Sequence, residues 1–235
     1  MKKIKAAALI AGASAALALT ACIGTDSAGS APSASVQDDS SAGQVQGNAS
    51  EGTDSGNGAA GGSGGILIAY FSVPETDGVD TVAGASRVAV DGGVMGNNEY
   101  IANLIQQETG GDLFAIETVQ EYPGTHDALL EFAYNEMLDD ARPELAAQIE
   151  NLDSYDTIFL GYPIWWDEAP MVISTFLESY DFTGKTIVPF CTSASDSIDN
   201  SLHIFGELAP DAVIAEGLTA NNEDDIAPWL NSLGY

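Results

Sequence analysis

Residues 157–166 read Thr-Ile-Phe-Leu-Gly-Tyr-Pro-Ile-Trp-Trp, an apolar run that passes through a glycine into two adjacent tryptophans. The apolar run predicts a buried strand at 157–161. Open α/β sheets bind ligands outside the carboxyl ends of their strands, which is where Trp165 and Trp166 would lie. Two interpretations stay open: the pair forms a flat wall for a flat aromatic ligand, or both rings pack under a loop as ordinary core residues.

Strands and helices alternate from residue 66 to residue 235, and this pattern predicts one α/β domain. Apolar runs predict strands at 66–71, 112–118, 157–161, 186–190 and 212–216, and apolar residues at helical spacing predict helices at 97–109, 127–142, 170–179, 201–208 and 223–233. Gly110-Gly111 is expected to end the first helix and Arg142-Pro143 the second. Five strands alternating with five helices imply a parallel sheet between two layers of helices.

The first 22 residues indicate export. A basic head, Met1–Lys5, precedes an apolar run at 6–19 that is too short to span a bilayer as a permanent helix. The run ends in Leu-Thr-Ala-Cys at 19–22, which resembles the bacterial lipobox. That resemblance implies a signal peptide at 1–21, lipidation of Cys22, and a lipoprotein anchored to the outer face of the cell membrane. The alternative is an ordinary secretory signal followed by a chance cysteine.

Composition and charge limit the partners of the chain. Residues 22–65 are rich in Gly, Ser and Asp with almost no large apolar side chain, so we expect a disordered tether. The formal charge of the whole chain is −29, and without residues 1–21 it becomes −32, from 35 acids against Arg87, Arg142 and Lys185. Such a surface repels nucleic acid and anionic bilayers, so we expect no nucleic-acid partner and membrane contact through the lipid alone.

Neither the acids nor the cysteines indicate a reactive centre. The acids have no calcium-loop spacing, and no Cys/His cluster suits zinc, so no metal site is predicted. Cys191 follows an apolar run with no nearby base in the sequence, and we expect it to be a small buried hydrophobic residue rather than a nucleophile.

Five stretches together resemble the flavodoxin family, over residues 66–235. They are ILIAYFS at 66–72, GNNE at 96–99, GGDLF at 110–114, YDTIFLGYPIWW at 155–166 and YDFTGKT at 180–186. The resemblance, to the long-insertion branch found in secreted bacterial proteins, implies a flavodoxin-like three-layer sandwich. Its five-stranded parallel sheet would have the order 2-1-3-4-5, with FMN bound at the topological switch point.

The resemblance also implies three FMN-binding loops. The phosphate would be received by Ser72, Gly96, Asn97 and Asn98, the ring would be flanked by Pro163, Ile164, Trp165 and Trp166, and the loop after the fourth strand would bring Thr192, Ser193, Ala194, Ser195 and Asp196 to the flavin. A helix N-terminus binds phosphate through free amides and its dipole, although asparagines there are also ordinary capping residues.

Four features depart from the usual flavodoxin pattern. An insertion at 73–95 separates Ser72 from Gly96, and Asp-Gly-Gly at 91–93 predicts the tight turn of a small hairpin that starts at 87–90. Asn98 stands where threonine is typical, Asp167 replaces a glycine, and residues 192–196 replace a glycine-rich loop. Asp196 beside the ring would lower the reduction potential or weaken flavin affinity.

Three functions are compatible with these observations. The first is a membrane-tethered FMN protein that carries electrons from a redox partner protein at the membrane and needs no catalytic residue. The second is an FMN-dependent NAD(P)H or quinone reductase, which the scarcity of basic residues disfavours. The third is a flavin-free surface protein that keeps the fold for binding, since a fold alone does not fix a function.

Overall fold

The computed structural model describes residues 64–77, 86–90 and 92–235, all within the unit Ser55–Tyr235. The signal peptide, Cys22 and nearly all of the expected tether lie outside these described residues and stay predictions. Within the described part of the chain, no helix has the length and apolarity needed to cross a membrane.

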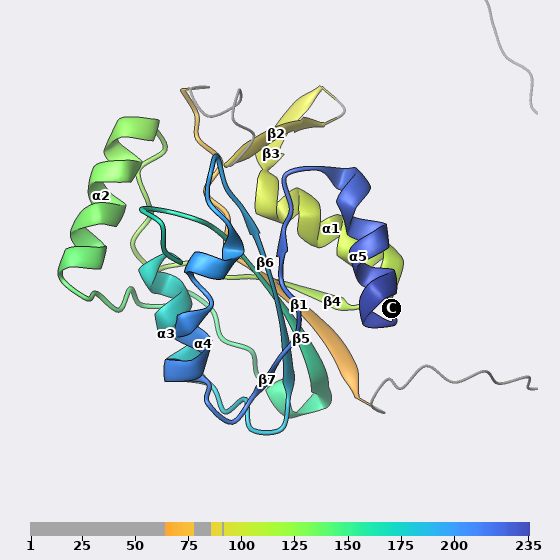
Figure 1. The fold of residues 1–235 in the computed structure, drawn as a ribbon. Coiled ribbons are helices and arrows are strands. Elements are labelled where there is room, and N and C mark those ends of the chain that lie inside the picture. Colours follow the sequence, from red (N-terminus) through yellow and green to blue (C-terminus); the bar gives the residue numbers. More distant parts are fainter. Residues whose placement is uncertain (1–63, 78–85, 91) are drawn as a thin grey trace, which may run out of the picture. The chain divides into compact units, whose positions relative to one another are not determined.

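A six-stranded parallel sheet forms the middle layer (Figure 1). Its strands are β1 (Gly65–Tyr70), β4 (Asp112–Ala115), β5 (Tyr155–Pro163), β6 (Thr186–Thr192), β7 (Val213–Ile214) and β8 (Leu218–Thr219). The order is β4-β1-β5-β6-β7, with β8 also paired to β6, and every pairing is parallel. Counted without β8 and the separate hairpin, this is the predicted order 2-1-3-4-5.

The last position of the sheet corrects the prediction of one strand at 212–216. Two short strands share it: β7 pairs with Thr186 and Ile187, and β8 pairs with Phe190 and Cys191. The break falls at Pro189, which has no backbone N–H to donate to a neighbouring strand. The sheet therefore has six strands where the sequence predicts five.

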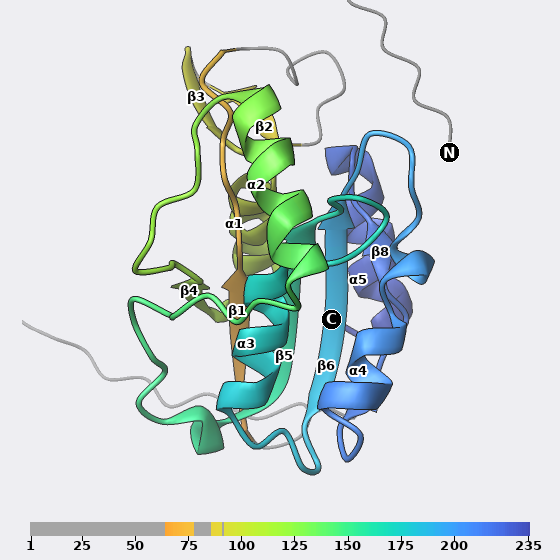
Figure 2. The same ribbon diagram turned by 90° about the vertical axis from the view of Figure 1, so that its left-hand side faces the viewer.

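Helices cover both faces of the sheet. They are α1 (Asn97–Thr109), α2 (His126–Leu138), α3 (Met171–Ser179), α4 (His203–Leu208) and α5 (Ile226–Leu233). Figures 1 and 2 show α1 and α5 on one face, with α3 and α4 on the other and α2 beside α3. Successive β5 residues fill the two cores: Ile158 and Leu160 pack toward the α3 and α4 side, and Phe159 packs toward α1 and α5. This two-sided burial explains the continuous apolar run in β5.

Helix ends differ from the sequence prediction where local chemistry intervenes. Helix α1 has its predicted bounds and ends at Gly110, which adopts the left-handed conformation with φ 72°. Helix α2 ends at Leu138, four residues before the predicted end, because Asp140 turns left-handed with φ 46° and the Ala141 amide donates back to the Glu136 carbonyl. The 3₁₀ turn η4 (Glu223–Asp225) replaces the expected first turn of the last helix. Another, η3 (Ile198–Asn200), lies before the helix predicted at 201–208, which begins at His203, and η2 (Leu152–Ser154) precedes β5. The predicted strand at 112–118 ends at Ala115.

A small antiparallel hairpin leads into α1, as predicted for the insertion. It consists of β2 (Arg87–Val90) and β3 (Gly93–Gly96), and Gly92 between them has φ 79°. Residues 78–85 and 91 of the insertion lie outside the described residues.

Cys191 is a buried residue of β6 that faces Thr219 of β8. Its thiol lies 3.8 Å from the Thr219 hydroxyl, and burial raises the pKa of the thiol to about 12. A thiol that stays protonated at physiological pH is a poor nucleophile. The side chain is therefore the small buried hydrophobic residue that the sequence predicts.

Candidate functional site

The N-terminus of α1 lies at the carboxyl end of the sheet. Gly96 is its N-cap residue and has no side chain that could cap the helix. The Asn97 amide donates to the Ser86 carbonyl at 3.0 Å. The remaining first-turn amides of a helix have no intrahelical acceptor. Because Gly96 occupies the N-cap position, Asn97 and Asn98 are the first two residues inside the helix and not its N-cap. An anion at this end of α1 would meet the positive end of the helix dipole.

Ser72 fills the space that a side chain at Gly96 would need. A Cβ built on Gly96 would lie 2.0 Å from the Ser72 Oγ and 2.9 Å from the Ser72 Cβ, far inside contact distance. Ser72 follows β1 by two residues, so the end of β1 places this hydroxyl directly against the start of α1. Glycine is required at position 96 by this close approach. The Ser72 hydroxyl and the first turn of α1 therefore lie side by side and form a cradle.

Asn98 joins the start of α1 to the end of β6. Its side chain is buried, and its Nδ2 donates to the Thr192 Oγ1 at 2.8 Å. Its Oδ1 is also buried and has no hydrogen-bond partner among the described residues. The Ile164 amide donates to the Thr192 carbonyl at 2.9 Å. Thr192 therefore brings the first and second predicted loops together at one edge of the sheet.

The two tryptophans have different environments. Trp165 is buried, with its ring centroid 5.5 Å from those of Phe71 and Tyr122. Trp166 is 48% exposed, has φ 55°, and donates from Nε1 to the Leu130 carbonyl of α2 at 2.9 Å. Core packing thus describes Trp165, whereas Trp166 presents an open face beside α2. Asp167, which replaces a glycine, continues this left-handed turn with φ 70°.

Side-chain hydrogen bonds shape the loop after β6. The Ser193 Oγ accepts from the Asp196 amide at 2.8 Å and from the Ser195 amide at 3.3 Å. The Ser193 backbone exchanges two hydrogen bonds with the Asn221 side chain, beyond β8. Ala194 and Ser195 are exposed, and the Ser195 hydroxyl donates to the Asp196 carboxylate at 3.2 Å. These side-chain hydrogen bonds fix the conformation of the loop, which lacks the glycines that are usual at this place in flavodoxins.

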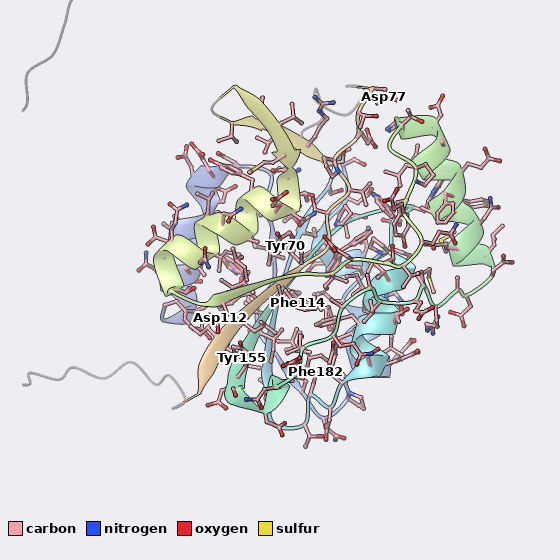
Figure 3. All side chains as sticks on the ribbon, turned by 180° about the vertical axis from the view of Figure 1, so that it is seen from behind. Tyr70, Asp77, Asp112, Phe114, Tyr155 and Phe182 are labelled. Atoms are coloured by element: carbon pink, nitrogen blue, oxygen red, sulfur yellow. The ribbon has the colours of Figure 1, made fainter. Side chains whose placement is uncertain are left out.

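A clamp that the sequence did not reveal holds the chain after Ser72. The buried Glu75 carboxylate lies 3.0 Å from the His126 Nδ1, at the start of α2. The Asp77 carboxylate, labelled in Figure 3, accepts from the His126 amide at 2.9 Å. The Thr76 amide and hydroxyl both donate to the Gly124 carbonyl. Contacts between residues about 50 positions apart leave no sequence pattern. The sequence therefore shows these acids and the histidine but does not indicate that they contact one another.

A cavity of about 320 Å³ opens beside Ser72. Its lining comes from the chain after β1 and from the segment after β4, and includes Phe71, Ser72, Glu117 and Tyr122. The surroundings are acidic. The pKa of Tyr70, at the end of β1 (Figure 3), is raised first by burial and then by the negative charges of Glu99 and Glu117. An anion bound here would experience a negative field from these carboxylates.

Comparison with known proteins identifies the family of this fold. The flavodoxin family model matches residues 86–233. The chain belongs to the flavodoxin family. Among solved structures, it is similar to a candidate flavoprotein from Bacteroides eggerthii. The two share 33% identity and a TM-score of 0.59, over 74% of this chain and 99% of that one. No protein of curated function matches it.

Two further structures show the same flavodoxin fold. A candidate flavoprotein from Bacteroides uniformis has 30% identity and a TM-score of 0.56, over 72% of this chain and 98% of that one. A flavoprotein from Lactobacillus acidophilus, solved in complex with FMN, has 19% identity and a TM-score of 0.50, over 69% of this chain and 97% of that one. The flavodoxin family thus accounts for the order of strands and for the position of the switch point at β1 and β5.

Proposed function

We propose that this flavodoxin-family protein binds FMN at the carboxyl end of its sheet and carries electrons. The observation that carries the proposal is the cradle at the start of α1, where the N-cap residue Gly96 admits the Ser72 hydroxyl against the first turn of the helix. Helix N-termini of this kind hold phosphate groups. The buried Asn98 Oδ1, which has no hydrogen-bond partner among the described residues, supplies one more polar atom in the same place. When bound, FMN would supply the redox chemistry of its ring.

The residues of this chain have distinct parts in that proposal. Ser72 and the first-turn amides of α1 would hold the phosphate, and Gly96 keeps the space open. The segment 163–166 and the loop 192–196 would border the ring, held in position through Thr192. These residue assignments remain predictions of the sequence, now supported by the hydrogen bonds that join the two loops to α1.

An electron carrier is favoured over a reductase that uses a nicotinamide donor. Dinucleotide phosphates are commonly recognised by arginine and lysine. Arg142 is held by Asp140 and Glu178, and Lys185 donates to the carbonyls of Leu152 and Tyr155. Both cations are thus engaged within the protein, which leaves few positive groups for a second nucleotide.

Titration of the apoprotein with FMN tests the proposal. We expect one FMN per chain at micromolar concentration or below, with quenched flavin fluorescence and a shifted absorbance spectrum. A bound flavin that is not reduced rapidly by added NADPH supports the carrier. Rapid NADPH oxidation supports the reductase instead, and the absence of binding at micromolar FMN supports a flavin-free binding protein.

We also propose that the mature chain is a lipoprotein anchored outside the cell membrane, where it meets a redox partner protein. The support is the sequence at 1–22 alone. Cys22→Ser is expected to move the protein from the membrane fraction to the soluble exported fraction, since the thiol is the attachment point of the lipid. Mass spectrometry of the membrane-bound protein should find acyl chains on an N-terminal Cys22, and an unmodified Cys22 would contradict the proposal.

A further inference from the structure

The Arg87 side chain projects from the face of the hairpin that packs against the Ser72 hydroxyl. Its Cα pairs with that of Gly96 across β2 and β3. Cross-strand partners in an antiparallel pair project to one face. On that face, the position that a Gly96 Cβ would occupy lies 2.0 Å from the Ser72 Oγ. The base of the Arg87 side chain is therefore next to the cradle at the start of α1.

The Arg87 guanidinium has more donors than the protein uses. One terminal nitrogen donates to the Glu75 carbonyl at 2.6 Å. The Nε is buried without a hydrogen-bond partner, and within the described part of the chain Arg87 forms no ion pair. A guanidinium carries five N–H donors, and a partly buried cation without an anion is costly. The geometry therefore leaves a charge and several donors for a ligand.

The Glu75 carboxylate forms no salt bridge with Arg87. The Glu75 carboxylate faces the His126 ring, although its own backbone carbonyl holds Arg87. The other two cations beyond residue 21 are engaged elsewhere: Arg142 lies past the end of α2, and Lys185 immediately precedes β6, at the opposite end of the sheet from the cradle. Arg87 is thus the cation placed to offset the acidic surroundings of the cradle.

We propose that Arg87 makes the site selective for the phosphorylated flavin, FMN, over riboflavin. This inference rests on the proposed function. A phosphate brings up to two negative charges into a site near Glu99 and Glu117, and an unpaired guanidinium offsets that repulsion by charge-assisted hydrogen bonds. Riboflavin has the same ring but no phosphate, so it gains nothing from Arg87. The competing explanation is that Arg87 only fastens the hairpin to the Glu75 carbonyl.

Dissociation constants for FMN and for riboflavin, measured at low and high salt, separate the two explanations. Arg87→Met is expected to weaken FMN binding about 10- to 100-fold and to leave riboflavin binding unchanged. Arg87→Lys keeps the positive charge but loses the planar set of guanidinium donors, and it should retain most of the preference for FMN over riboflavin. Higher salt should reduce the difference in FMN affinity between the wild type and Arg87→Met, because it screens the attraction between Arg87 and the phosphate. Arg142→Met, which removes a distant paired cation, is the matched control and should change neither constant.

Each result has a defined meaning. If Arg87→Met weakens the binding of FMN and of riboflavin equally, and Arg87→Lys behaves like Arg87→Met, then Arg87 only fastens the hairpin. That result overturns the inference. Unchanged FMN binding overturns it as well. Should Arg87→Met fail to fold, the Arg87→Lys constants for the two flavins decide the question. If the wild type binds neither flavin, the proposed function itself is overturned. If the wild type binds FMN and riboflavin with equal affinity, only the inference about Arg87 is overturned.

Discussion

Trp165→Ala is expected to lower the free energy of unfolding by about 3–5 kcal/mol, the usual loss when a buried tryptophan is truncated. Trp165 is 8% exposed and contacts two other rings, Phe71 at 5.5 Å and Tyr122 at 5.5 Å. Tyr122 in turn contacts Phe132 of α2, so truncation leaves a cavity at the centre of an aromatic cluster. Urea unfolding followed by circular dichroism measures the change. A loss below about 1 kcal/mol would mean that Trp165 is not a core residue.

Trp166→Ala is the matched control, because it removes the same side chain from the next position. Trp166 is 48% exposed, with one hydrogen bond to the Leu130 carbonyl and a tilted contact with the Tyr134 ring at 4.9 Å. We expect a loss of about 1 kcal/mol or less. FMN titration of both variants under folding conditions completes the comparison. An unchanged FMN dissociation constant in both would remove the interpretation of the pair as an aromatic wall.

The tryptophan pair shows what the sequence determines and what it does not. The apolar run before it located β5 and hence the edge of the sheet, because a buried parallel strand needs apolar residues on both faces. The direction of each ring depends on the backbone turn at Trp166 and Asp167, where both residues have positive φ. Non-glycine residues rarely adopt that conformation, so no sequence pattern announces it. Position was therefore predictable, and orientation was not.

The same distinction applies to the sheet and to the polar contacts of the site. The parallel three-layer arrangement followed from the alternation of strands and helices, because crossovers in such folds are right-handed and short. The order of the strands followed only from the resemblance to flavodoxins. The split between β7 and β8 depended on one missing N–H at Pro189, which a reading of apolar runs overlooks. The bond from Asn98 to Thr192 spans 94 positions. Such contacts arise only after the chain has folded, so the sequence indicated the residues and not their partnership.

Gly96→Ala is expected to weaken FMN binding about 10- to 100-fold for each phosphate hydrogen bond that it displaces. The added methyl group would lie 2.0 Å from the Ser72 Oγ and 2.9 Å from its Cβ, so rotation of the hydroxyl alone does not relieve the overlap. Either the end of β1 or the start of α1 must move, which also costs about 1–3 kcal/mol of stability. Fluorescence titration with FMN and urea unfolding measure the two effects.

Gly206→Ala controls for the general effect of replacing glycine by alanine. Gly206 lies in α4, and a Cβ built there meets nothing within 4 Å. Alanine in a helix is more stable than glycine by about 0.5–1 kcal/mol, so this variant should gain stability and bind FMN like the wild type. A loss of FMN binding in Gly206→Ala would show that the assay responds to remote changes.

The double variant Gly96→Ala with Ser72→Gly separates the collision from the loss of the hydroxyl. Without the Ser72 side chain, the nearest remaining atom to the alanine methyl is the Pro74 Cδ at 3.7 Å, an ordinary van der Waals distance. Stability lost in Gly96→Ala should therefore return in the double variant, a coupling that a double-mutant cycle measures. FMN binding should stay weaker than in the wild type, because the cradle has lost its hydroxyl donor. Full recovery of both properties would show that position 96 needs only space and that Ser72 does not hold the phosphate.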